Sequence, residues 1–162
     1  MAEFSRNLAV VIGIDQYKNG ISSLATAVND ADQINQKLQK DHNYQGWCLL
    51  DEDATLEKLK HLLTVTLPQQ VKADDRLLFY FAGHGIALNG EEGPEGYLIP
   101  QDATLGNTGS YLPMTQLQRS LTGLPCRHFL GLLDCCFAGA FRWSSTRDIG
   151  LVPTVIHRER YD

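Results

Sequence analysis

The 162-residue sequence lacks several features that would assign it to common classes of protein. No apolar run approaches the roughly 20 residues of a membrane helix, and the first residues do not resemble a secretory signal. Lys and Arg number 14 against 19 Asp and Glu, which gives a net charge of -5. This balance disfavours nucleic-acid binding, which needs a clustered basic surface. We therefore expect a cytoplasmic protein without membrane or nucleic-acid partners.

Cysteine is also scarce, since the chain has only Cys48, Cys126, Cys135 and Cys136. In a chain of this length, that number does not suggest a disulfide scaffold, so we expect reduced thiols. A zinc site formed by Cys126, Cys135, Cys136 and His84 is an alternative. It is disfavoured because structural zinc sites usually show paired Cys-x-x-Cys or similar spacing.

Short β-branched apolar runs alternate with helical patterns along the chain. Apolar runs predict strands over residues 8–14, 47–50, 76–82, 97–99 and 128–135. Leucine-rich periodicity predicts helices over residues 24–38, 56–67 and 114–121, the second of which should end at Pro68. This alternation predicts a doubly wound, mainly parallel α/β sheet with helices on both faces.

The periodic pattern ends before the C-terminus of the sequence. We assign residues 1–141 to one α/β region and residues 142–162 to an exposed linker without a closing strand or helix. The region looks like part of a larger domain, incomplete at its C-terminal end.

Unusual polar stretches follow three of the predicted strands. They are Asp15-Gln16-Tyr17, Gly83-His84-Gly85 and Asp134-Cys135-Cys136. Ligand sites of parallel α/β sheets lie beyond the carboxyl ends of the strands, so these positions favour function.

His84 is a candidate general base because it stands between two glycines at a strand end. Cysteine hydrolases need a thiol, a base and donors for an oxyanion. Gly83 and Gly85 would let the backbone turn sharply and approach a substrate. A buried histidine that caps a turn is the alternative.

The two adjacent cysteines are separated by the alternation of side chains along a strand. Asp134 shares one face with Leu132, whereas Cys135 falls on the other face. Cys135 is interpreted as a small core residue, and Cys136 then lies at the turn that leaves the strand. Two packed core thiols remain the alternative.

These motifs together resemble the caspase-like cysteine peptidases, and in particular the metacaspases and their prokaryotic relatives, the orthocaspases. "YFAGHG" resembles the family's histidine motif and "LDCCFAG" its Asp-x-Cys-x-x-Gly motif. "LAVVIGIDQY", "LATAVNDADQI" and "GYLIPQDA" match further stretches in the same order. The resemblance therefore covers residues 8–141, as the large-subunit region of such a peptidase.

The resemblance implies a mechanism and a specificity. It implies a His84–Cys136 dyad, with the backbone amides of Gly85 and Cys136 as the oxyanion hole. Asp30 and Asp134 match the acidic pocket that binds Arg or Lys before the scissile bond. The alternative for Asp30 is a carboxylate that interacts with a helix terminus.

The resemblance also implies partners. The substrates would be peptides or proteins, and a C-terminal small-subunit chain would complete the fold. Self-processing would cut the tail at one of its arginines, for which the candidates are Arg142, Arg147, Arg158 and Arg160.

The sequence departs from the family pattern at two places. Ala82 stands where the family often has serine. The calcium site of many metacaspases would have to come from the scattered acids Glu91, Glu92, Glu95 and Asp102. We therefore expect no cofactor or metal, with calcium dependence left open. A non-catalytic caspase-like interaction module is the alternative function.

Overall fold

The computed structural model of the protein describes residues 3–135 and 154–159. Its strands are β1 (Arg6–Gly13), β2 (Tyr44–Leu50), β3 (Asp75–Ala82), β4 (Gly85–Gly90), β5 (Gly93–Leu98), β6 (Leu112–Pro113), β7 (His128–Asp134) and β8 (Thr154–Glu159). Its α-helices are α1 (Ala27–His42), α2 (Leu56–His61), α3 (Leu67–Gln70) and α4 (Met114–Thr122). Short helical turns η1 (Asp51–Asp53), η2 (Leu62–Thr66) and η3 (Thr108–Ser110) connect some of these elements.

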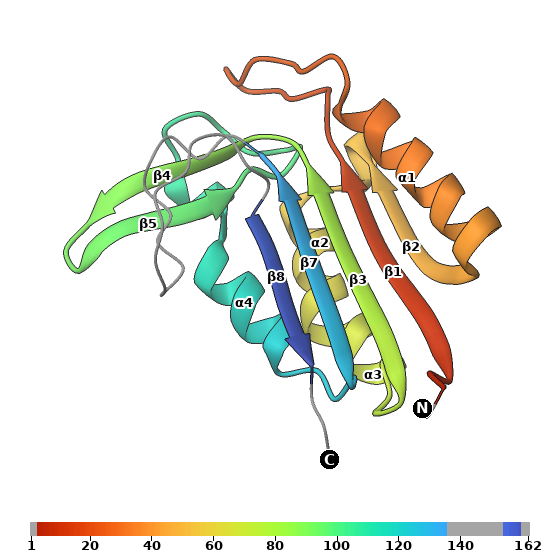
Figure 1. The fold of residues 1–162 in the computed structure, drawn as a ribbon. Helices are drawn as coiled ribbons and strands as arrows, with labels where there is room; N and C mark the ends of the chain where they lie inside the picture. Colours follow the sequence, from red (N-terminus) through yellow and green to blue (C-terminus); the bar gives the residue numbers. More distant parts are fainter. Residues whose placement is uncertain (1–2, 136–153, 160–162) are drawn as a thin grey trace.

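The main sheet has five strands in the order β2-β1-β3-β7-β8 (Figure 1). The first four are parallel to one another, and β8 runs antiparallel to β7. The strand order steps outward from β1 in both directions, which is the doubly wound arrangement. The fold class predicted from the sequence is therefore confirmed.

Helices cover both faces of this sheet because its central strands are apolar on both sides (Figure 1). Ala9 and Val11 of β1 pack on the face that α1 covers. Val10 and Ile12 point to the opposite face, which α2, α3 and α4 cover. The larger core cluster lies on this second face, and its buried residues include Leu59, Leu67 and Leu117. This cluster is called the α2–α4 core below.

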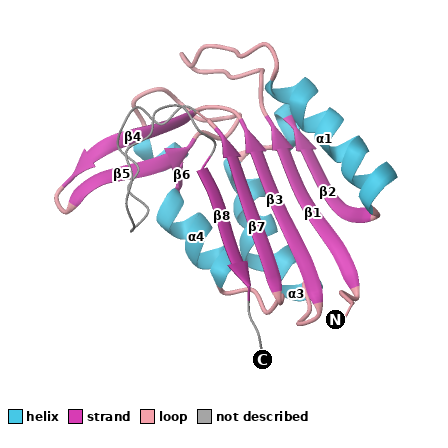
Figure 2. Cartoon of the chain, in the orientation of Figure 1, coloured by secondary structure: helices cyan, strands magenta, loops and turns pink. Residues whose placement is uncertain are grey.

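A second sheet of three short strands has the order β4-β5-β6 (Figure 2). Its first strand begins at Gly85, directly after His84. Strands β4 and β5 form an antiparallel hairpin that projects beyond the main sheet. The sequence predicted only a short strand at residues 97–99. Strand β4 was missed because glycine at both ends and Asn89 give it a weak strand pattern.

The predicted helix over residues 56–67 does not end at Pro68. It passes through η2, a π-helical turn in which the Leu67 amide donates to the Leu62 carbonyl, and continues as α3 to Gln70. Proline lacks an amide donor and its ring crowds the preceding turn. A widened turn just before Pro68 accommodates both defects, so the helical path continues.

The C-terminal residues were predicted to form a linker without a strand, and that prediction is wrong for residues 154–159. They form β8, in which Arg158 is the register partner of Phe129 on β7. Thr154, Val155 and Ile156 are a β-branched run that suits a strand, and the edge of β7 offers unpaired backbone groups. The other three candidate processing arginines, at positions 142, 147 and 160, lie outside the described residues.

None of the helices within residues 3–135 and 154–159 is both long enough and apolar enough to span a bilayer.

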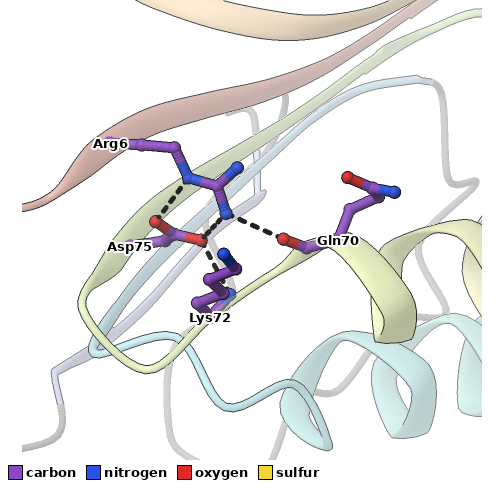
Figure 3. Close-up of polar contacts among 4 residues, drawn as sticks. All are labelled: Arg6, Gln70, Lys72 and Asp75. Atoms are coloured by element: carbon purple, nitrogen blue, oxygen red, sulfur yellow. Dashed lines mark hydrogen bonds and ion pairs between the residues drawn. The ribbon is translucent and has the colours of Figure 1, made fainter.

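An ion pair between the half-buried Arg6 and the buried Asp75 joins the starts of β1 and β3 (Figure 3). The guanidinium of Arg6 donates to both carboxylate oxygens of Asp75, with N–O distances of 3.0 and 2.6 Å, and to the Gln70 carbonyl at 2.8 Å. Asp75 is fully buried and also accepts the Lys72 amide at 2.7 Å. The hydrogen bonding between the Arg6 guanidinium and the Asp75 carboxylate raises the pKa of Arg6. Asp75 therefore links the start of β1 to the start of β3, because its carboxylate accepts from the Arg6 side chain and from the Lys72 backbone amide.

We predict that Asp75→Ala lowers the free energy of unfolding by about 2–3 kcal/mol, because it leaves the donors of Arg6 and Lys72 without their buried acceptor. Urea denaturation followed by circular dichroism measures this change. Asp41→Ala is the matched control, because it breaks the exposed Lys37–Asp41 pair and should leave the midpoint unchanged. Equal destabilisation by the two variants would contradict the prediction.

Candidate active site

The carboxyl ends of β1, β3 and β7 lie at the same level of the sheet. Gly13 pairs with Ala82, and Ala82 pairs with Asp134. The first two predicted functional stretches begin one or two residues beyond this level, and the third begins at it with Asp134. The register therefore brings the three stretches to one edge of the sheet.

The stretch that follows β1 is held by two carboxylates. Asp15 is buried and accepts the amides of Ala27 and Val28, at 2.9 and 3.3 Å, so it caps the first turn of α1. Thr26, the residue before the helix, makes no side-chain cap of its own. Asp51 accepts the amides of Asp15 and of the next residue, at 2.7 and 2.8 Å. The path of the chain toward Tyr17 is thus defined by side-chain acceptors.

His84 lies between β3 and β4 and is half-buried. Its Nε2 is 2.8 Å from the carbonyl oxygen of Ser22, in the loop between β1 and α1. A carbonyl oxygen only accepts hydrogen bonds, so Nε2 must carry the proton. In the neutral imidazole, Nδ1 then has the lone pair and can take a proton from a thiol.

Tyr17 contacts His84 through both its hydroxyl and its ring. The hydroxyl accepts the backbone amide of His84 at 2.7 Å and donates to the Ile99 carbonyl at 3.2 Å. The two rings lie 4.7 Å apart, measured between their centres. Tyr17 is only 6% exposed, and its burial raises the pKa of the phenol.

Gly83 is required by this close contact. A Cβ atom at position 83 would lie 2.6 Å from the Tyr17 hydroxyl and 3.0 Å from the ring of Phe81. The glycine was predicted to let the chain turn and approach a substrate. The structure shows a more specific reason, since the space beside Gly83 is filled by Tyr17.

The Gly85 amide faces away from β5. The Ile99 amide donates to the His84 carbonyl, so the pair 84/99 is a hydrogen-bonded pair of the antiparallel ladder. The next pair, Gly85 and Leu98, is then of the non-hydrogen-bonded kind, in which the amides point outward. Among the described residues β4 pairs with β5 alone, so the Gly85 amide is directed away from that strand.

The strand-face prediction for β7 is confirmed. Leu132 packs with the cluster on the α1 side, whereas Leu133 and Cys135 pack with the α2–α4 core. Cys135 is half-buried and near enough to add to the rise in the pKa of Tyr17 that burial mainly causes. Cys136 lies outside the described residues, one position further along the chain.

Asp134 contacts Tyr80 of β3, and Asp30 lies within electrostatic range of the same phenol. The Tyr80 hydroxyl is 3.4 Å from Oδ2 of Asp134. Burial raises the pKa of Tyr80 to about 12, and the charges of Asp134 and Asp30 add to that rise. Asp134 is exposed and Asp30 is half-buried in the first turn of α1. The charges of both predicted pocket carboxylates therefore act on one phenol.

The acidic residues considered for calcium make contacts within the protein. Glu95 accepts the Tyr97 hydroxyl at 2.7 Å, and Asp102 accepts the Leu56 amide at 2.9 Å. Across the described part of the chain, no group of three or more His, Cys, Asp or Glu side chains is arranged to hold a metal ion.

Sequence reasoning missed the roles of Tyr17, Ser22 and Tyr80. Tyr17 was part of a flagged stretch, but nothing in the pattern pointed from it to His84. Ser22 acts through its carbonyl, which every residue type has, so its side chain gives no signal. Tyr80 looked like one more apolar residue of a buried strand.

Comparisons with known proteins agree with the fold and with the resemblance to the caspase-like family. The family model described as the caspase domain matches residues 6–156. The fold is similar to the crystal structure of protein GSU0716 from Geobacter sulfurreducens, with a TM-score of 0.68 and 16% sequence identity. The match covers 83% of this chain and 52% of that one, so this chain spans about half the length of that protein. The search of curated proteins found no match.

We predict that Tyr80 ionises with a midpoint near pH 12, seen as the difference in phenolate absorbance between the wild type and Tyr80→Phe. Because the folded pKa lies above the ordinary value of 10.0, the protonated phenol stabilises the fold fully below pH 10. That contribution is lost as the pH rises toward 12, so Tyr80→Phe should flatten the alkaline loss of stability. A midpoint near pH 10 would contradict the prediction.

Proposed function

The chain belongs to the caspase-domain family of cysteine peptidases, and we propose that it is a cytoplasmic cysteine endopeptidase of the metacaspase or orthocaspase branch. In this proposal it uses a His84–Cys136 dyad and cleaves after Arg or Lys. The observation that carries the proposal is the hydrogen bond from His84 Nε2 to the Ser22 carbonyl, because it leaves Nδ1 as the basic nitrogen.

The proposed reaction begins with proton transfer from the Cys136 thiol to Nδ1 of His84. The thiolate attacks the scissile carbonyl carbon, and a C–S bond forms. The tetrahedral intermediate then expels the amine, which takes its proton from His84. Water, deprotonated by His84, attacks the thioester, and the acid product leaves with the thiol restored.

The oxyanion of that intermediate needs donors that are already in place. The outward direction of the Gly85 amide supports its assignment as one donor, since it faces away from β5. The Cys136 amide is the proposed second donor. We propose no cofactor and no metal for this chemistry.

Selectivity for Arg or Lys is supported by the pair of carboxylates whose charges act on Tyr80. The Tyr80 phenol keeps its proton at neutral pH and can donate only one hydrogen bond to Asp134, so acceptor positions on the carboxylate oxygens are left for a substrate cation. Charge-assisted hydrogen bonds from a guanidinium or ammonium group would satisfy both carboxylates.

We propose two further properties of the whole protein. A C-terminal small-subunit chain would complete the domain, in line with the match to about half of the similar solved structure. The segment between β7 and β8 would be cut by self-processing after Arg142 or Arg147. Arg158 is a weaker candidate than these two, because its backbone is paired in β8.

We predict that the full-length protein hydrolyses fluorogenic peptides that end in Arg or Lys, and not those that end in Asp, with or without added calcium. His84→Ala and Cys136→Ala should each reduce kcat by at least about 10³-fold, because the base and the nucleophile act as a unit. Mass spectrometry of the same preparations should find cleavage after the tail arginines only where Cys136 is intact.

Cys135→Ala is the matched control for the nucleophile. It changes the adjacent thiol and should keep kcat within a few-fold of the wild-type value. Loss of activity in Cys135→Ala alone would reverse the assignment, and a preference for Asp would remove the proposed specificity. Absence of hydrolysis by the wild type would favour the non-catalytic interaction module.

We predict that Asp30→Asn and Asp134→Asn each lower kcat/KM for Arg and Lys peptides by about 10–100-fold, the worth of a hydrogen bond to a charged group. Asp32→Asn is the matched control, because it removes the same charge from the same helix. Asp32 accepts the Gln36 side chain at 2.7 Å, and its variant should keep the wild-type kcat/KM. Equal losses in all three variants would indicate a general effect of charge.

A further inference from the structure

We propose that Tyr17 is a positioning residue whose hydroxyl, inserted into the β4–β5 ladder, holds His84 out of β4 and in contact with the Ser22 carbonyl. This inference rests on the proposed function, because it concerns the base of that reaction. It assigns a task to a side chain that is not itself expected to touch the substrate.

The first support is a missing direct bond in the ladder. In an antiparallel hydrogen-bonded pair, two residues exchange both N–H···O bonds. The Ile99 amide does donate to the His84 carbonyl, at 3.0 Å. The reciprocal bond would run from the His84 amide to the Ile99 carbonyl, and the Tyr17 hydroxyl takes its place. This hydroxyl accepts from the His84 amide at 2.7 Å and donates to the Ile99 carbonyl at 3.2 Å.

This insertion is suited to keep the base in place. The hydroxyl must both accept and donate, so it works only while the phenol is protonated. Burial raises the pKa of Tyr17, and the phenol keeps its proton at neutral pH. The Tyr17 ring also lies 4.7 Å from the imidazole ring, so the same residue contacts the backbone and the side chain of His84.

The space beside Gly83 is occupied by the Tyr17 hydroxyl. A Cβ on Gly83 would meet the Tyr17 hydroxyl at 2.6 Å, so glycine is the residue that admits it. The chain before Tyr17 is held by Asp51 through the amides of Asp15 and Gln16. The hydroxyl therefore reaches the ladder from a supported turn.

Removing the hydroxyl has an unusual consequence. The His84 amide and the Ile99 carbonyl, both released, are the natural partners of each other in an antiparallel ladder. If they pair directly, little stability is lost, but His84 is drawn toward β4 and away from Ser22. The positioning role thus predicts a large effect on chemistry with a small effect on folding.

The test compares Tyr17→Phe with the wild-type full-length protein. We expect kcat to fall by about 10–100-fold, because a misplacement near 1 Å has an effect of this size. KM should stay within threefold. The ¹⁵N signals of the His84 imidazole, assigned with His84→Ala, should change from the Nε2–H tautomer to a mixture.

Tyr111→Phe is the matched control for loss of a buried hydroxyl. Tyr111 is 4% exposed and accepts the Gly106 amide at 3.0 Å. Its variant should have a similar or larger loss of thermal stability with unchanged kcat and tautomer. A kcat of Tyr17→Phe within twofold of wild type, or an equal kcat loss in Tyr111→Phe, would overturn the proposal.

Gly83→Ala is a second variant that keeps Tyr17 and displaces its hydroxyl. It should produce the same tautomer change even if Tyr17→Phe does not fold. The imidazole signals also separate this proposal from the proposed function, since they need no hydrolysis. An inactive wild type with the expected tautomer change would refute the peptidase and support the positioning, whereas an unchanged tautomer in both variants would refute the positioning.

Discussion

The parallel ladder through β1, β3 and β7 is the constraint on which the site depends. Its register aligns Gly13, Ala82 and Asp134, so the three following segments emerge side by side. Local sequence interactions cannot bring these segments together, because about 50 to 70 residues separate one from the next. The hydrogen bonds of the sheet convert that separation into adjacency, and the apolar faces of the strands anchor the sheet between its helices.

The parts of the structure that the sequence predicts are those with a local pattern. Continuous apolar runs identified β1, β3 and β7, and the alternation along β7 placed Leu133 and Cys135 on one face. The positions of His84 just beyond β3 and of Asp134 at the end of β7 followed from the same reasoning. The matching of Asp30 and Asp134 to one acidic pocket came from the family resemblance, because the spacing of the two residues in the sequence carries no distance information.

The parts that were missed depend on backbone groups or on partners far along the chain. Strand β4 has little strand propensity and is defined by its pairing with β5. Strand β8 depends on the open edge of β7. Pro68 indicates a helix end only if the preceding turn is regular, and η2 is not. The contact of Tyr17 with His84 combines a hydroxyl with an amide 67 residues away, which no periodicity encodes.

The Ser22 contact has a consequence for how such proteins diverge. Because the carbonyl oxygen belongs to the main chain, mutation at position 22 can replace the exposed side chain without deleting the acceptor. The side chain at this position of the loop between β1 and α1 can therefore change while the backbone geometry stays the same. A comparison by residue identity alone would not register the acceptor, because the side chain at position 22 does not supply it. The contact depends on the backbone path of this loop. Asp15 and Asp51, just beyond the ends of two neighbouring strands, hold that path by accepting backbone amides.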